Sequence, residues 1–285
     1  MAGCLLRIRE IMNSLTPKEK KVASYILEYP AEVVGHSIEE LARISQVSIS
    51  TVVRLCKSLG YSGYKELLRM LSTDLVLMQQ DSITYTDVRP GDSIDMIVRS
   101  VSMSNTKAIE NTLSVLDEKE LLRAIDVICQ AERVDFYGVG SSGNVALDAN
   151  NKFMRINKIS IASQDPHVQI LSATTLKAGD VAVLISYSGE TMDILETAEI
   201  VRQSGATIIS ITRLGKNPLS ELADIRLYSS SVEGMVRSGA MSSRIGQLNI
   251  IDILYTAVTS CEYDKVKPYL DRTRIATSHK RVRSS

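Results

Sequence analysis

The chain has 285 residues, enough for two ordinary domains, and its 33 basic and 33 acidic side chains give a formal net charge of zero. A chain without net charge has no global field that would attract nucleic acid or a membrane, so any DNA contact must come from a local patch. The four cysteines lack paired spacing, which argues against a zinc site or a disulfide framework. Apolar runs are too short to span a bilayer and no signal peptide is visible, so we expect a cytoplasmic protein without metal or cofactor.

Residues 1–77 show helical spacing of apolar residues and no strand pattern, which predicts an all-α domain. Two capping boxes, Thr16-Pro17-Lys18-Glu19 and Ser37-Ile38-Glu39-Glu40, mark helix N-termini. The second box opens a short helix. After the connector Ser45-Gln46-Val47, a further helix is expected from Ile49 to Leu59, with Ser48 as its cap. A short helix, a tight turn and a second helix together predict a helix-turn-helix unit.

The second helix of this unit carries polar side chains of the kinds that contact base edges and phosphates. These candidates are Ser48, Ser50, Thr51, Arg54 and Lys57. The residues alone allow two interpretations, a DNA-binding unit or a plain three-helix bundle with a basic, hydroxyl-bearing face. The segments Ser37–Ala42 and Ser48–Leu67, however, resemble the N-terminal domain of RpiR-type bacterial transcription regulators. This resemblance implies that the chain binds an operator in double-stranded DNA.

Beyond a linker at residues 78–92, which breaks the periodicity, the pattern changes to strands that alternate with helices. Amphipathic helices are expected from Ser93 to Leu113 and from Lys119 to Gln130, packed on a sheet. Strands are expected in the apolar runs that begin at Val134 and Val181, and at Ile159–Ala162, Thr207–Ile211 and Ile225–Tyr228. This alternation predicts an α/β three-layer sandwich with a doubly wound parallel sheet over residues 93–262.

Two of the expected strands end in clusters of glycine and small hydroxyl residues, Gly138-Val139-Gly140-Ser141-Ser142-Gly143 and Ser186-Tyr187-Ser188-Gly189-Glu190-Thr191. Ligands bind at the carboxyl ends of parallel strands, and helix N-termini there favour anions. Either loop alone is typical of ordinary N-caps and turns. The pair predicts an anion site, with phosphate as the expected anion.

Both loops resemble the signature loops of the sugar isomerase (SIS) domain, a phosphosugar-binding module, and the resemblance spans about residues 130–262. It implies that the hydroxyls of Ser142, Ser186, Ser188 and Thr191 hold a sugar phosphate. It also places the backbone N–H of Ser141 toward the ligand, with Gly189 in the second loop. RpiR-type regulators join the two domains in this order, so the combination implies a regulator that senses a phosphorylated sugar.

An enzyme is the alternative, because a sensor and a SIS-type isomerase bind the same ligand. Glu233 is the best candidate base and could equally accept hydrogen bonds from sugar hydroxyls. His167, in a segment interpreted as a loop, is the histidine best placed to assist. The attached helix-turn-helix favours the sensor, so we assign no catalytic residue. A dinucleotide-binding oxidoreductase fits poorly, since no acidic residue closes a following strand at the expected distance.

From Arg244 to Val258 the apolar pattern predicts a closing helix with more apolar surface than one solvated face allows. That surface suits a dimer interface or burial against the sheet, and we expect a homodimer or a tetramer. Residues 263–285 are polar and basic, and we interpret them as a mobile tail, either solvated or touching DNA phosphate.

Overall fold

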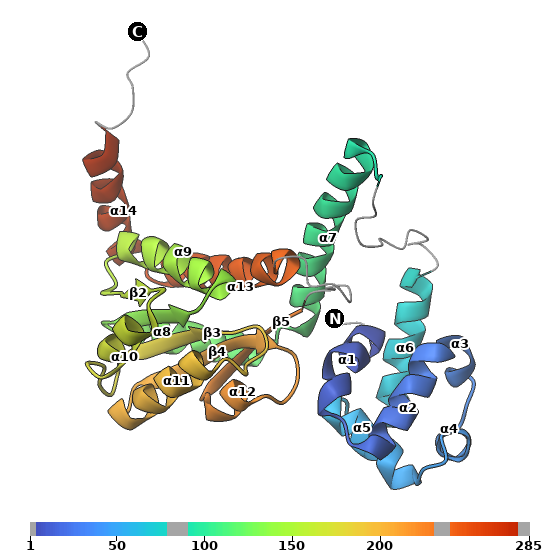
Figure 1. The fold of residues 1–285 in the computed structure, drawn as a ribbon. Coiled ribbons are helices and arrows are strands. Elements are labelled where there is room, and N and C mark those ends of the chain that lie inside the picture. The colour runs from blue at the N-terminus through green and yellow to red at the C-terminus, as the bar shows by residue number, and fades with distance from the viewer. Residues whose placement is uncertain (1–3, 79–90, 231–239, 279–285) are drawn as a thin grey trace. The chain divides into compact units, whose positions relative to one another are not determined.

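The computed structural model of the chain describes residues 4–78, 91–230 and 240–278. Figure 1 shows the elements in chain order. The chain divides into two compact units, residues 1–115 with 214–216 and residues 116–213 with 217–285. The predicted domain limits at residues 77, 92 and 262 stay predictions. Within the described segments, no helix is both long and apolar enough to cross a membrane.

The N-terminal unit is helical, as predicted. Its elements are α1 (Cys4–Ile11), η1 (Met12–Ser14), α2 (Pro17–Glu28), α3 (Pro30–Val33), α4 (Ile38–Ile44), α5 (Ile49–Ser58), α6 (Tyr64–Met78) and α7 (Ile94–Val115). Both predicted capping boxes are confirmed: Thr16 and Ser37 accept from Glu19 and Glu40, which reach back to the two caps. Apolar side chains at helical spacing then form a common core, in which Ile26, Leu41 and Leu55 are fully buried.

The second unit is built on a five-stranded sheet. Its strands are β1 (Val134–Gly138), β2 (Ala162–Ser163), β3 (Val181–Ile185), β4 (Thr207–Arg213) and β5 (Ile225–Ser229). All pair in parallel, in the order β2-β1-β3-β4-β5. Every residue of β1 and β3 is buried, which explains the continuous apolar run of β3, whereas β1 also buries the charged residue Asp135.

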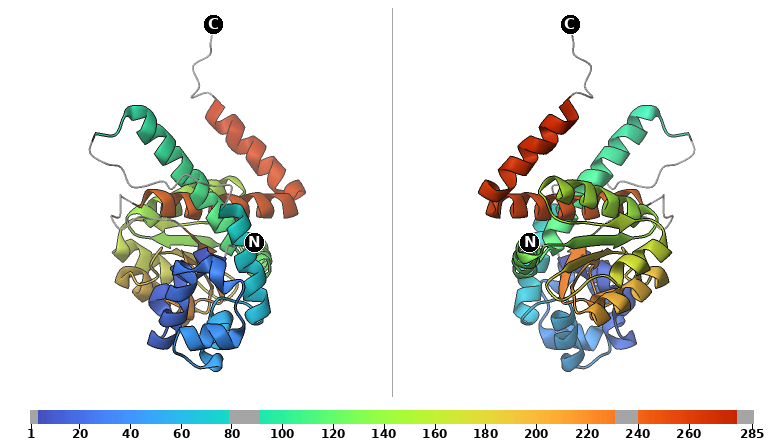
Figure 2. Two further views of the ribbon diagram at one scale, coloured as in Figure 1. Left: turned by 90° about the vertical axis from the view of Figure 1, so that its right-hand side faces the viewer. Right: turned by 90° about the vertical axis from the view of Figure 1, so that its left-hand side faces the viewer.

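Helices cover both faces of this sheet, and the two views of Figure 2 show the strands between them. One face carries α8 (Glu118–Gln130), α9 (Ser141–Arg155) and α13 (Met241–Cys261). The other carries α10 (Pro166–Ala173), α11 (Met192–Ser204) and α12 (Pro218–Leu222). The predicted α/β three-layer sandwich with a parallel sheet is therefore confirmed.

The strand expected at Ile159–Ala162 is shorter and shifted, because Asp135 interrupts its pairing. Ile159 pairs with Arg133 only as an isolated bridge. The N–H of Ile161 donates to the carboxylate of Asp135 at 3.0 Å in place of a backbone carbonyl. Asp135 lies on β1, so a side chain takes over part of the ladder and β2 is left with two residues.

Two segments predicted to lack regular structure are helical. Asp165 accepts the N–H of His167 at 2.8 Å and caps α10, with Pro166 as its first residue, so the expected loop is wrong. The expected mobile tail is wrong for residues 263–278, which form α14 (Tyr263–Ser278). Val266 is buried, and Leu270 packs on the same core four residues later. These two side chains attach this mostly polar helix to the sheet domain. Residues 279–285 lie outside the described part.

Candidate functional site

The strand order places a crevice between β1 and β3. The chain leaves β1 for β2 on one side and returns to β3 on the other, so the order of connection reverses at this pair. Such a switch point is where open α/β sheets bind ligands, beyond the carboxyl ends of the strands. Gly138 of β1 stands opposite Ile185 of β3, so the two predicted loops leave the sheet side by side.

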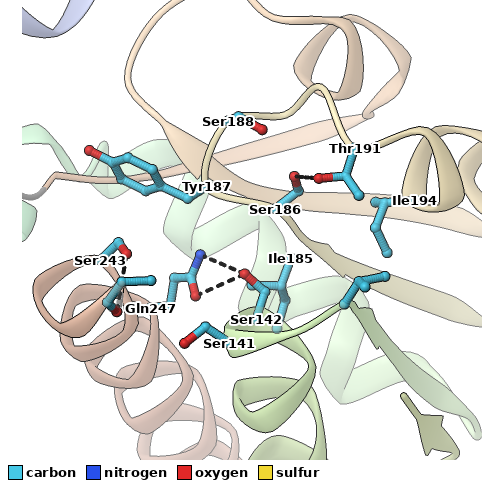
Figure 3. A pocket seen from close by; sticks show the side chains of 12 residues that line it. Ser141, Ser142, Ile185, Ser186, Tyr187, Ser188, Thr191, Ile194, Ser243 and Gln247 are labelled. Atoms are coloured by element: carbon cyan, nitrogen blue, oxygen red, sulfur yellow. Dashed lines mark hydrogen bonds between the residues drawn. The ribbon is translucent and has the colours of Figure 1, made fainter. Parts of the chain in front are cut away.

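A cavity of about 530 Å³ opens at this point, and Figure 3 shows the side chains around it. Its walls come from the loop after β1, the loop after β3 and the first turns of α13. The lining residues are Val139, Ser141, Ser142, Ile185, Ser186, Tyr187, Ser188, Thr191, Ile194, Ala240, Ser243 and Gln247. The structure thus brings together five of the seven predicted effector-site residues. Gly189 lies in the same loop, and Glu233 lies outside the described residues.

The first wall is the N-terminal turn of α9. The first backbone bond of this helix runs from the N–H of Asn144 to Gly140, so the N–H groups of Ser141 to Gly143 precede the helical ladder. Gly138 allows the turn to form, because a Cβ there would lie 2.6 Å from the carbonyl oxygen of Ser142. No side chain caps this helix. Its amides and the positive end of its dipole therefore suit an anion.

The second wall is the loop from Ser186 to Thr191. The hydroxyls of Ser186 and Thr191 share a hydrogen bond of 3.1 Å. The oxygens of Ser186 and Ser188 accept the N–H groups of Gly189 and Glu190, both at 3.2 Å. These serines therefore do shape the turn. Because the serine oxygens accept these N–H groups, the proton of Ser188 and one proton of the Ser186–Thr191 pair are left for other partners.

Gly189 fixes this loop against α12. Its φ of +69° is in the left-handed region, and a Cβ there would lie 2.0 Å from Oδ1 of Asn217. Asn217 is buried, caps α12 by accepting the N–H of Ser220 and donates to the hydroxyl of Thr212 at 3.1 Å. The turn therefore packs on Asn217, whose side chain is itself held by hydrogen bonds, and this contact keeps the hydroxyls of the turn in place.

The third wall, from α13, was missed by the sequence analysis. Gln247 is 1% exposed, and its amide lies 3.2–3.3 Å from the hydroxyl of Ser142. Ser243, one turn earlier, lines the same cavity. Figure 3 shows both side chains between α13 and the two loops. The available signal was that both polar residues fall on the same helical stripe as the apolar Ile250, Leu254 and Val258.

The cavity is rich in donors and lacks charge. None of its described lining residues is acidic, basic or a histidine. His167 is exposed on α10 and is not one of them. Hydroxyls and amides are groups that can donate hydrogen bonds to an anion, and a phosphoryl group is an anion with several acceptor oxygens.

A second candidate site is the turn between α4 and α5. Gln46 takes a left-handed φ of 55°, and Val47 donates its N–H to Ala42 at 2.9 Å, which closes α4 tightly. Ser48 occupies the N-cap position of α5 but makes no bond to a helix N–H, so its predicted capping bond is wrong. Its hydroxyl instead contacts those of Ser50 and Thr51, at 2.8 and 3.0 Å.

The exposed face of α5 and its N-cap contain four of the five residues predicted to contact DNA. Ser48, Ser50, Arg54 and Lys57 are exposed, whereas Thr51 is fully buried. The sequence did not reveal this burial, because threonine occurs on both kinds of helix face. Ile49 was not predicted to be at the surface, yet 45% of it is exposed beside these polar residues.

Comparison with known proteins assigns both halves of the chain. The helix-turn-helix domain of the rpiR family matches residues 2–76, and the SIS domain matches residues 127–257. An uncharacterized HTH-type transcriptional regulator of Caldanaerobacter subterraneus is 41% identical over 99% of each chain. The HTH-type transcriptional regulator HexR of Pseudomonas aeruginosa is 33% identical over 96% of this chain and 95% of its own.

A solved structure is similar over the whole length. The NanR protein of Vibrio vulnificus, complexed with ManNAc-6P, is 30% identical and has a TM-score of 0.62. The match covers 98% of this chain and 100% of that one.

Proposed function

The chain belongs to the rpiR family of helix-turn-helix transcriptional regulators that carry a SIS domain, and we propose that its effector is a phosphorylated sugar bound in the hydroxyl-lined cavity. The observation that carries this proposal is the convergence of four hydroxyl side chains with the N-terminal turn of α9. The similar NanR protein, whose structure contains ManNAc-6P, supports the same ligand class.

In this proposal Ser142, Ser186, Ser188 and Thr191 donate to the phosphate, and the first amides of α9 complete its shell. Charge-assisted bonds of this kind contribute about 1.5–3 kcal/mol each. The sugar ring would then lie toward α13, where Ser243 and Gln247 offer further polar groups. Glu233 would accept from sugar hydroxyls.

The helix-turn-helix is proposed to bind operator DNA through Ser48, Ser50, Arg54 and Lys57. We propose a homodimer in the cytoplasm, in which the effector binds one arrangement of the subunits better than the other. By linkage, that preference changes the spacing of the two recognition helices and hence the affinity for DNA. Half-sites one helical turn apart tolerate little change in that spacing.

A thermal-shift screen tests the effector. The panel contains hexose, pentose and N-acetylated amino-sugar phosphates, each with its unphosphorylated sugar and with inorganic phosphate as controls. One phosphosugar should raise Tm in proportion to its occupancy, while its free sugar should not. Equal stabilisation by sugar and phosphosugar would contradict the phosphate site.

We further propose that the chain is a sensor and not an isomerase. The described residues that line the cavity include no acid or base to move a proton between carbons. Incubation with the best phosphosugar in heavy water should therefore give no deuterium on the sugar carbons. Protein-dependent deuteration that is lost in Glu233→Gln would establish the enzyme instead.

A further inference from the structure

Ile49 is the first residue of α5, and its side chain is out of place among the apolar residues of that helix. Val52, Leu55 and Cys56 are fully buried, as the amphipathic pattern requires, whereas Ile49 is 45% exposed. Among the described residues 4–75, Tyr29 is the other large apolar side chain exposed to this degree. Tyr29 packs on the ring of Tyr25 and donates its hydroxyl to Glu28, so its exposure has a local explanation.

A single exposed aliphatic side chain is common on protein surfaces and does not by itself indicate a binding site. The position of Ile49 in the helix-turn-helix is what indicates a function. Ile49 lies at the N-terminal end of the second helix of the helix-turn-helix, where residues of a recognition helix contact base edges. It is next to the exposed Ser50, and Arg54 lies one turn after Ser50 on the exposed face of α5.

We propose that Ile49 reads a thymine in the operator by packing against its 5-methyl group. The 5-methyl of thymine is the apolar group that base edges present in the major groove, and aliphatic side chains contact it there. A β-branched side chain in a helix has one strongly preferred rotamer, so little side-chain entropy is lost when it is ordered on DNA. The inference rests on the proposed DNA-binding function and adds a specificity residue to it.

The test begins with the full-length protein and a pool of random duplexes. Selection and sequencing yield the preferred site. Each thymine of that site is then replaced singly by deoxyuridine, which removes the methyl group and leaves every hydrogen-bonding atom in place. At one thymine per half-site, replacement by deoxyuridine should lower the affinity of the wild-type protein about three- to fivefold, which corresponds to the burial of one methyl group.

Variants identify the side chain that reads this thymine. Ile49→Ala should bind the thymine duplex more weakly than wild type and should no longer distinguish thymine from deoxyuridine at that position. Ile49→Val, which keeps the branch, should retain part of the discrimination. The matched control is Ile275→Ala, because Ile275 is also exposed, at 66%, but lies on α14 in the other unit. It should behave as wild type does.

Different results would contradict the role of Ile49 and the proposed DNA binding. Enrichment of no sequence would overturn the DNA-binding function and the inference together. A selected site at which wild type ignores every deoxyuridine substitution would overturn the inference alone. So would a deoxyuridine loss that is as large in Ile49→Ala as in wild type. If Ile49→Ala failed to fold, Ile49→Val would still decide, because an unchanged deoxyuridine loss in that variant would overturn the assignment to Ile49.

Discussion

The side-chain amide of Gln247 contacts the hydroxyl of Ser142 at 3.2 Å, which joins α13 to the first turn of α9 across the cavity. An amide both donates and accepts, so Gln247 can donate to the Ser142 oxygen after a ligand has taken the Ser142 proton. The contact is therefore compatible with an empty and with an occupied site. It also gives α13 a direct link to Ser142, a residue of the proposed phosphate site.

The first prediction replaces this amide with a carboxylate. Gln247→Glu should weaken the phosphosugar by about tenfold or more, because a negative charge then faces the phosphate in a poorly solvated place. Gln247→Leu, the matched neutral variant, loses the hydrogen bond without adding charge and should weaken it by less. Titration calorimetry at pH 7.5 measures both. Similar losses in the two variants would show that charge at this position does not matter.

The second prediction tests the loop after β3. Ser188→Ala removes one hydroxyl donor and should weaken the phosphosugar by about tenfold or more, the value of one charge-assisted hydrogen bond. Folding should be nearly unchanged, because Ser188 makes one local bond of 3.2 Å, to the N–H of Glu190. Ser204→Ala is the control, since Ser204 also makes local bonds, to Val201 and Ala206, at the C-terminal end of α11. Equal ligand-induced Tm shifts in wild type and Ser188→Ala would contradict the assignment.

The third prediction concerns the backbone beneath these hydroxyls. Gly189→Ala must adopt a positive φ and displace Asn217, whose Oδ1 would lie 2.0 Å from the new Cβ. Gly179 is a matched control, because its φ is +91° and no atom lies within 4 Å of a Cβ there. Gly179→Ala should cost about 1 kcal/mol of strain, and Gly189→Ala should cost more. Denaturant unfolding measures the difference. An equal loss of unfolding free energy in the two variants would show that Asn217 moves aside easily.

The features that could be predicted from the sequence are those encoded by residues close together in the chain. The strand-to-helix loops at Gly138–Gly143 and Ser186–Thr191 are continuous segments, so their residue types indicate both their structure and their chemistry. The capping boxes at Thr16 and Ser37 are equally local. The alternation of strands and helices was enough to predict the sheet and, through it, the meeting of the two loops.

Contacts between distant residues explain what could not be predicted. Gln247 and Ser142 are 105 positions apart, and the buried stripe of α13 does not indicate which distant residue Gln247 contacts. The two-residue length of β2 follows from Asp135, which bonds a backbone N–H 26 positions away. The helix at residues 263–278 depends on a core that its own polar sequence does not reveal.

The fourth prediction concerns pH and the start of the chain. Asp74 on α6 is buried and accepts the N–H of Leu5 at 2.8 Å, at the N-terminal turn of α1. Burial raises the pKa of this carboxyl above its usual value, although bonds from the backbone N–H groups of Leu5 and Cys4 partly oppose the rise. The folded state therefore binds a proton more readily than the unfolded state does. The free energy that Asp74 contributes is greatest below its unfolded pKa and declines as pH rises through the raised, folded one.

Asp74→Asn removes this titration and keeps an acceptor for α1. The unfolding free energy of wild type relative to Asp74→Asn should therefore increase as pH is lowered from 7 toward 4. Denaturant unfolding of both proteins across that range measures the difference. A difference that is flat, or that decreases on acidification, would show that the carboxyl keeps an ordinary or lowered pKa.

The fifth prediction separates the roles of two cations on α5. Arg54 and Lys57 are both exposed, three residues apart, on the proposed DNA-binding face. An arginine fork suits a guanine edge, whereas a lysine acts on phosphate as a point charge. Arg54→Ala should bring operator binding close to the affinity for random duplex. Lys57→Ala should weaken both by similar factors and reduce the salt dependence of log K by about one unit.

Binding to operator and random duplex at two salt concentrations measures these effects. Lys119→Ala is the control, because it removes one exposed positive charge from α8, in the other unit. It should change neither the affinity nor the salt dependence by a comparable amount. If the control matched Lys57→Ala, DNA would be held by net charge alone. If neither α5 variant changed affinity, the helical unit would be structural, and the case for an enzyme would strengthen.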